Sequence, residues 1–126
     1  LQRMIGIIWV ALGGAIGAAA RYGTDAAAQR LLGGAPHWGT LVCNVLGSFL
    51  AGLMFGALLR GEISIEQRLF FGVGMLGSYA TFAFFSLDAM RMIEDGAWPQ
   101  AVGYAFATLL LSLGAVGLGL ALARGT

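Results

Sequence analysis

Long stretches without charged residues alternate with short charged segments along this chain of 126 residues. A helix rises about 1.5 Å per residue, so about 20 apolar residues are needed to cross the hydrocarbon core of a bilayer. Four stretches are long enough for one crossing each if His37 is counted as neutral: residues 4–20, 31–59, 69–87 and 96–123. The pattern predicts an all-α integral membrane protein, one domain over residues 1–126, with membrane-spanning helices at 4–23, 39–59, 67–94 and 98–123.

The composition agrees with a membrane protein. Charged residues make up 10% of the chain and hydrophobic residues 59%, whereas soluble domains carry about 25% charged residues. The high hydrophobicity excludes a disordered chain, and a net charge of +1 gives no basic surface for nucleic acid. The single cysteine, Cys43, cannot form an intrachain disulfide, and we interpret it as a small buried hydrophobe.

The arginines are almost evenly divided between the two sides of the membrane. With four crossings, the N-terminus, the 60–68 loop and the C-terminus share one side. That side carries Arg3, Arg60, Arg68 and Arg124, and the other carries Arg21, Arg30 and Arg91. The positive-inside rule gives little bias for such a distribution. Two interpretations stay open: a topology set by folding or by a helper protein, and a dual topology in which copies insert both ways and pair antiparallel.

The predicted helices are rich in glycine, with 21 glycines in the chain. Gly13 and Gly17 have the G-x-x-x-G spacing, and so do Gly52 and Gly56. Small residues at this spacing let membrane helices pack closely. The glycines therefore indicate a compact bundle or an oligomer, but no specific activity.

Neutral polar residues recur at intervals of four on two helices, which places each set on one helix face. A hydroxyl in a membrane helix can bond the carbonyl four residues before it, and this is the structural alternative to lining a path. The amide of Asn44 has no such easy partner, so Asn44 is the stronger candidate for a functional group. The two sets are Thr40, Asn44 and Ser48 on the 39–59 helix, and Tyr104, Thr108 and Ser112 on the 98–123 helix.

The 67–94 segment predicts a helix broken near its middle, because glycines at 72, 74 and 77 lead into Ser78 and Tyr79. Broken membrane helices are tolerated where they line a cavity or bind an ion through freed carbonyls. Phe82 and Phe85, three residues apart, are expected to share a face after the break. Two roles stay open for them: an aromatic packing cluster, or ring edges that meet a dehydrated anion.

The sequence carries no enzyme signature. It has one histidine, His37, and no nucleophile triad, phosphate-binding loop or paired mid-membrane carboxylates. Asp88 is the one acid within a predicted span rather than at its boundary, and the 4–23 span contains none. A small multidrug-type antiporter shares the size and the four spans but needs a membrane-embedded glutamate in its first span, so this alternative is disfavoured.

Three segments together resemble the Fluc (CrcB) family of small fluoride channels. Residues 13–22, GGAIGAAARY, are similar to the end of that family's first span, which closes on an arginine. Residues 39–49, GTLVCNVLGSF, are similar to its G-T-L-x-x-N-x-x-G segment. Residues 74–86, GMLGSYATFAFFS, resemble its broken-helix segment, which typically reads G-x-x-G-G-x-T-T-F-S-T-F-S.

The resemblance implies passive, selective export of fluoride from the cytoplasm through the bacterial inner (plasma) membrane, and hence fluoride resistance. It implies an antiparallel, dual-topology homodimer with two pores. It also implies a structural sodium ion at the dimer interface, held by main-chain carbonyls of the broken helices.

By position, the resemblance assigns Asn44 as a pore-lining polar group and Phe82 and Phe85 as the pore phenylalanines. The carbonyls of Gly77 and Ala80 would bind sodium. The remaining candidates for the fluoride path are the threonine before the first phenylalanine, the first-span arginine and the polar sets: Thr81, Arg21, Thr40, Ser48, Tyr104, Thr108 and Ser112.

Three positions depart from the family pattern, since Ala80, Ala83 and Phe84 stand where it has hydroxyl residues. Loss of hydroxyls beside an anion path is expected to raise the barrier to entry, and Phe84 is expected to narrow the pore. The alternatives to an ordinary channel are therefore a weakly conducting one, a non-conducting subunit, or the degenerate half of a heterodimer with a paralogous partner.

Overall fold

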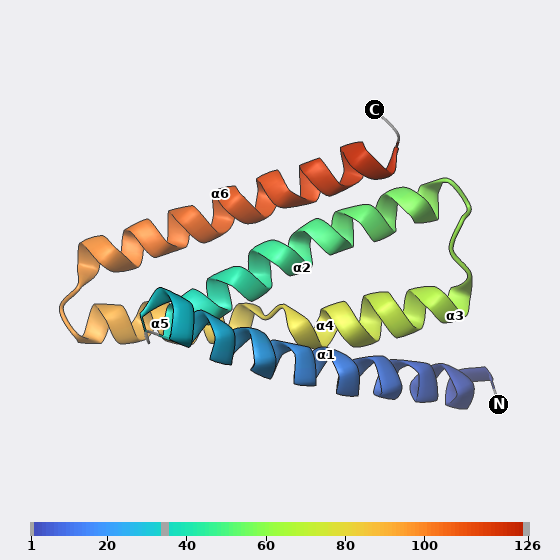
Figure 1. Cartoon of the computed structure of the whole chain (residues 1–126), viewed down its shortest axis with the longest axis horizontal. Helices are drawn as coiled ribbons and strands as arrows, with labels where there is room; N and C mark the ends of the chain where they lie inside the picture. The colour runs from blue at the N-terminus through green and yellow to red at the C-terminus, as the bar shows by residue number, and fades with distance from the viewer. Residues whose placement is uncertain (1, 34–35, 125–126) are drawn as a thin grey trace.

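The computed structural model describes residues 2–33 and 36–124 as an all-helical chain. Within these residues, four helical segments are long and apolar enough to cross a membrane: Arg3–Leu32, His37–Leu59, Ile65–Glu94 and Trp98–Ala123. The prediction of four spans is confirmed. In order, the elements are α1 (Gln2–Leu32), α2 (Pro36–Leu59), α3 (Ile65–Gln67), η1 (Arg68–Leu76), α4 (Gly77–Tyr79), α5 (Phe82–Glu94) and α6 (Trp98–Ala123) (Figure 1).

The first helix is longer than the predicted 4–23, because α1 continues to Leu32. The charged residues do not stop it: Arg21 and Asp25 lie four apart on one face, with Arg21 Nη2 3.9 Å from Asp25 Oδ2. Gly33 follows the helix at a φ of 105°, in the left-handed region where helices commonly end. Arg21 therefore lies inside α1, well before its end.

The third span begins at a capping box and is interrupted in its middle. Ser64 Oγ accepts a hydrogen bond from Gln67 N at 3.1 Å, and Gln67 Oε1 accepts one from Ser64 N at 3.0 Å. The chain then passes through η1, a wider π-helical stretch, into α4. Ala80 and Thr81 have extended backbone, at φ −96° and ψ 142° and at φ −148° and ψ 129°, before α5 begins. We call these two residues the 80–81 segment.

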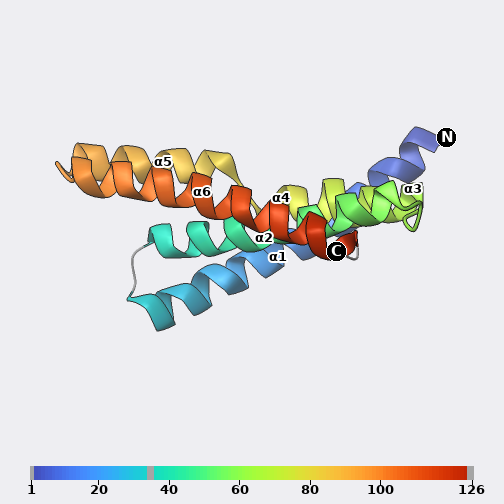
Figure 2. The ribbon, with the colours of Figure 1, turned by 90° about the horizontal axis from the view of Figure 1, so that it is seen from above.

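The helices pack through the glycines that the sequence singled out. A Cβ on Gly13 would meet the Phe70 carbonyl of η1, and one on Gly17 would meet Met75 O and Ser78 Oγ. On the other side of the bundle, a Cβ on Gly52 would meet Val116 O of α6. These close approaches explain why α1 runs beside η1 and α2 runs beside α6 (Figures 1 and 2). In contrast, Gly103, Gly114 and Gly117 of α6 face open space.

The N-terminus, the 60–64 connection and the C-terminal end of α6 lie at one end of the molecule (Figure 1). The C-terminal end of α1, the start of α2 and the connection between α5 and α6 lie at the other end (Figure 1). At the first end, Arg60 Nη1 donates to the Ala123 carbonyl at 2.8 Å, and Arg60 Nε is 3.0 Å from Glu62 Oε1. The 80–81 segment lies about midway along the length of the bundle, far from both ends (Figures 1 and 2).

Candidate functional site

A cavity of about 310 Å³ opens beside the 80–81 segment, between α2, α5 and α6. Many residues predicted for the ion path meet there, although they come from distant parts of the sequence. None of the lining residues is acidic or basic. The lining consists of Asn44, Ser48, Ala80, Thr81, Phe82, Phe85, Ala105, Thr108, Leu109 and Ser112.

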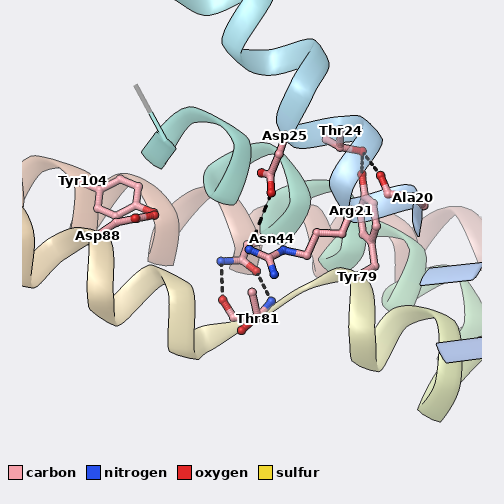
Figure 3. Close-up of polar contacts among 9 residues, drawn as sticks. All are labelled: Ala20, Arg21, Thr24, Asp25, Asn44, Tyr79, Thr81, Asp88 and Tyr104. Atoms are coloured by element: carbon pink, nitrogen blue, oxygen red, sulfur yellow. Dashed lines mark hydrogen bonds and ion pairs between the residues drawn. The ribbon is translucent and has the colours of Figure 1, made fainter. Parts of the chain in front are cut away.

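Asn44 of α2 is paired with the main chain of the 80–81 segment. Thr81 N–H donates to Asn44 Oδ1 at 2.8 Å, and Asn44 Nδ2 donates to the Thr81 carbonyl at 3.2 Å (Figure 3). The expectation that this amide lacks an easy partner is therefore wrong. The two bonds replace those that an extended residue loses by leaving the helix. One Nδ2 hydrogen is engaged with Thr81, and the amide has two.

The two phenylalanines after the break lie together, as their spacing predicts. The ring centroids of Phe82 and Phe85 are 5.6 Å apart and tilted by 50°. Both rings line the cavity, and Phe82 is 77% exposed. Phe85 also contacts the ring of Tyr104, with centroids 5.2 Å apart. The cavity wall is thus a short aromatic surface beside the Asn44 amide.

Two hydroxyls of α6 line the same cavity without hydrogen-bond partners. Thr108 is only 8% exposed, yet its Oγ1 has no partner among the described residues, and the same holds for Ser112 Oγ. Neither hydroxyl bonds the carbonyl four residues before it, which was the structural alternative for both. A buried unpaired hydroxyl is costly, so these two atoms are the lining groups with hydrogen-bonding capacity left over for a polar species.

Tyr104 and Thr40 do not line the cavity, although both are buried. Tyr104 Oη donates to Asp88 Oδ2 at 3.3 Å, and the Tyr104 ring also contacts His37 with centroids 5.4 Å apart. Asp88 thus belongs to a separate polar pair beyond Phe85. The sequence indicated that Asp88 lies within a span, but its partner is sixteen residues away on the next helix and no local pattern connects the two.

Arg21 of α1 also lies outside the cavity lining. Its Nη2 is 3.9 Å from Asp25 Oδ2, and its guanidinium carbon is 4.0 Å from the ring centroid of Phe84. In Figure 3 the side chain extends from α1 toward Asn44 and Thr81. Phe84 is not among the residues that line this cavity, and its ring lies under Arg21 instead.

The break changes the environment of the carbonyls at Gly77 and Ala80. In a continuous helix, Thr81 N–H would donate to the Gly77 carbonyl, but here it donates to Asn44 Oδ1. Ala80 has extended backbone, so its carbonyl has left the helical direction. Carbonyl oxygens released in this way are hard donors that suit a hard cation. Among the described residues, no three His, Cys, Asp or Glu side chains gather to bind a metal.

The other side of the break is tied to α1. Ser78 Oγ donates toward the Gly14 carbonyl at 3.0 Å and the Gly74 carbonyl at 2.9 Å. Tyr79 Oη and Thr24 Oγ1 share a hydrogen bond of 2.8 Å, and Thr24 Oγ1 also donates to the Ala20 carbonyl (Figure 3). Sequence reasoning gave neither contact, because each joins the break to a helix more than fifty residues away.

Two lining residues were also not predicted, Ala105 and Leu109. They stand three residues before Thr108 and Ser112, respectively, on the same face of α6. Their spacing of three residues from Thr108 and Ser112 was a sufficient sequence signal to predict that they line the same cavity. Their small or apolar side chains contribute space and shape, whereas Asn44, Thr108 and Ser112 contribute polarity.

The chain matches a known family over most of its length. The family described as "CrcB-like protein, Camphor Resistance (CrcB)" matches residues 8–120. The protein named "Fluoride-specific ion channel FluC" of Agrobacterium fabrum (strain C58) is 47% identical over 122 residues, which are 96% of this chain and 98% of that protein. The protein of the same name from Chelativorans sp. (strain BNC1) is 48% identical over 122 residues, with the same coverage. A protein of that name from Thermus thermophilus is 45% identical over 104 residues, 82% of this chain and 83% of that protein.

These relatives are named as ion channels and not as enzymes, and all come from bacteria. Together with the four apolar helices, they identify a multi-pass bacterial membrane protein. Every residue that lines the cavity falls within the matched region. The chain belongs to the CrcB family.

Proposed function

We propose that this chain forms a passive, fluoride-selective channel that exports fluoride from the bacterial cytoplasm. Relatives at 45–48% identity carry the name of a fluoride-specific ion channel. The cavity beside the 80–81 segment supplies neutral donors and aromatic rings, with no acidic residue among its lining to repel an anion. No ionisable side chain lines it that would couple transport to protons, so the fluoride gradient alone drives the flux.

The unpaired hydroxyls of Thr108 and Ser112 carry this proposal. Fluoride is small and strongly hydrated, so a path through a membrane must replace its lost water with other hydrogen-bond donors. Two hydroxyls on one face of α6 and the Asn44 amide offer donors along the cavity. The rings of Phe82 and Phe85 add edges with partial positive charge.

We propose an antiparallel homodimer with two pores as the assembly. Phe82, which directly follows the break, is 77% exposed in the single chain, so a second copy packed against the break would cover it. Each copy would present the break of its third span at the dimer centre. The carbonyls of Gly77 and Ala80 from both breaks would hold a structural sodium ion, which would fix the two copies to each other.

The experiment is fluoride efflux from liposomes that contain the purified protein, followed with a fluoride-selective electrode. We expect rapid efflux that exceeds the leak of protein-free liposomes, with chloride retained. Cross-linking in the same liposomes reports whether the dimer is intact. Absence of efflux from an intact homodimer would contradict the proposal, and efflux restored only by a paralogous subunit would identify this chain as half of a heterodimer.

A further inference from the structure

The ring of Phe84 lies under the guanidinium of Arg21, outside the cavity lining. The guanidinium carbon is 4.0 Å from the ring centroid, well within the range of a cation–π contact. Phe84 is in the first turn of α5, and Arg21 is on α1. This contact therefore joins α1 to the part of the third span that directly follows the break.

Arg21 has few other partners. The side chain is 16% exposed, and its Nε is buried without a hydrogen-bond partner among the described residues. Asp25 Oδ2 lies 3.9 Å from Nη2, which is longer than a hydrogen bond. Two described groups therefore stabilise the charge of this mostly buried guanidinium: the Asp25 carboxylate at 3.9 Å on the same helix, and the face of the Phe84 ring at 4.0 Å on α5. Cation–π contacts are stronger when the cation has lost its water.

Asp25 attracts the guanidinium from α1, but the start of α5 has no such charge to attract it. Thr81 is the N-cap of α5 and makes no side-chain cap hydrogen bond, so the partial positive charge of this helix start is not offset there. The N-terminal end of a helix therefore does not stabilise a positively charged guanidinium. The negative face of an aromatic ring provides the missing attraction. Threonine, the residue of the family pattern at position 84, has no such face.

We propose that Phe84 is a positioning residue that holds the Arg21 guanidinium against the start of α5, beside the Asn44–Thr81 pair. The positive charge then stays next to the cavity and raises the local concentration of fluoride. This role in conduction rests on the proposed function. The contact between Arg21 and Phe84 is independent of it. The departure at position 84 thus supplies a different kind of group and does not block the path.

The contact is tested by NMR on the full-length protein in lipid bilayers, with arginine labelled by ¹³C and ¹⁵N. The Arg21 signal is assigned as the one that Arg21→Lys removes. A guanidinium above a ring is displaced upfield by the ring current, and we expect Phe84→Leu to abolish this displacement. Phe84→Tyr is expected to retain it, and Phe55→Leu serves as the matched control because Phe55 is 48% exposed and Phe84 46%. An Arg21 signal unchanged by Phe84→Leu overturns the proposal.

Fluoride efflux tests the consequence. We expect Phe84→Leu to raise the fluoride concentration for half-maximal flux about threefold to tenfold, with the dimer intact, and Phe84→Tyr to keep the original value. Equal half-maximal concentrations in the original protein and in Phe84→Leu overturn the role in conduction even if the NMR displacement is lost. If the original protein conducts no fluoride, the proposed function fails, and the NMR result alone decides whether Phe84 positions Arg21.

Discussion

The two sides of the 80–81 segment contain similar hydroxyl groups but pair them differently. On the side of α1, Tyr79 Oη is bonded to Thr24 Oγ1, and Ser78 Oγ is bonded to main-chain carbonyls. On the side of the cavity, Thr108 Oγ1 and Ser112 Oγ are buried and have no partner among the described residues. Pairing within the chain is what a purely structural hydroxyl requires, since burial without a partner costs free energy.

This difference indicates two roles around the 80–81 segment: structural hydrogen bonds on the side of α1, and groups available to an ion on the side of the cavity. The hydroxyls toward α1 hold the break in place, and in the proposed channel the unpaired hydroxyls of α6 bind the permeant ion. Asn44 takes part in both roles, because its amide is hydrogen-bonded to the backbone of Thr81 and its side chain also lines the cavity. Substitutions on the two sides should therefore have opposite signatures: loss of stability toward α1 and loss of flux toward the cavity.

The largest effect is expected for Asn44→Asp. A carboxylate can still accept from Thr81 N–H but cannot donate to the Thr81 carbonyl, and it places a negative charge in the cavity. We expect fluoride flux to fall about 100-fold, which corresponds to about 2.7 kcal/mol. Liposome efflux measures this, and cross-linking checks that the dimer persists. Flux equal to that of the original protein would show that Asn44 does not face the ion.

On the side of α1, Gly17→Val should reduce stability. The added side chain would overlap Met75 O and Ser78 Oγ, so α1 and η1 must separate. We expect a loss of about 2 kcal/mol, the usual scale for overpacking, measured by thermal unfolding in detergent. Gly23→Val is the control on the same helix, because nothing lies within 4 Å of a Cβ at Gly23. Equal melting temperatures for the two variants would contradict the close packing.

The smallest effect is expected for Tyr79→Phe. The change removes the hydrogen bond with Thr24 Oγ1, which keeps its bond to the Ala20 carbonyl and so is not left unpaired. We expect a loss of about 1 kcal/mol in stability and no change in fluoride flux. Tyr22→Phe is the control, because Tyr22 is 79% exposed. A large loss of flux in Tyr79→Phe would mean that the α1 side is not merely structural.

The sequence predicts the fold well because charges are absent from the spans and glycines recur at packing distances. The interval of four between Thr108 and Ser112 also predicts their common face, since α6 is a continuous helix. Prediction fails at the end of α1, where an arginine and an aspartate four residues apart let the helix continue.

Prediction also fails around the break, for a different reason. Two extended residues reset the helical phase, so spacing across positions 80 and 81 does not reveal which face Phe84 occupies. The pairing of Asn44 with Thr81 joins residues 37 apart, and no local pattern encodes it. These contacts depend on how α1, α2 and α5 meet, which only the three-dimensional arrangement provides.

The most direct test of the central claim is fluoride efflux from liposomes containing the double variant Thr108→Val, Ser112→Ala. Ser86→Ala is the matched control, because Ser86 is exposed and does not line the cavity. Removing two donors from the path should lower fluoride flux about tenfold or more, with the dimer intact and the melting temperature equal or higher, because two unpaired buried hydroxyls are removed. Flux in the double variant equal to that of Ser86→Ala would contradict the claim that these hydroxyls bind the permeant ion.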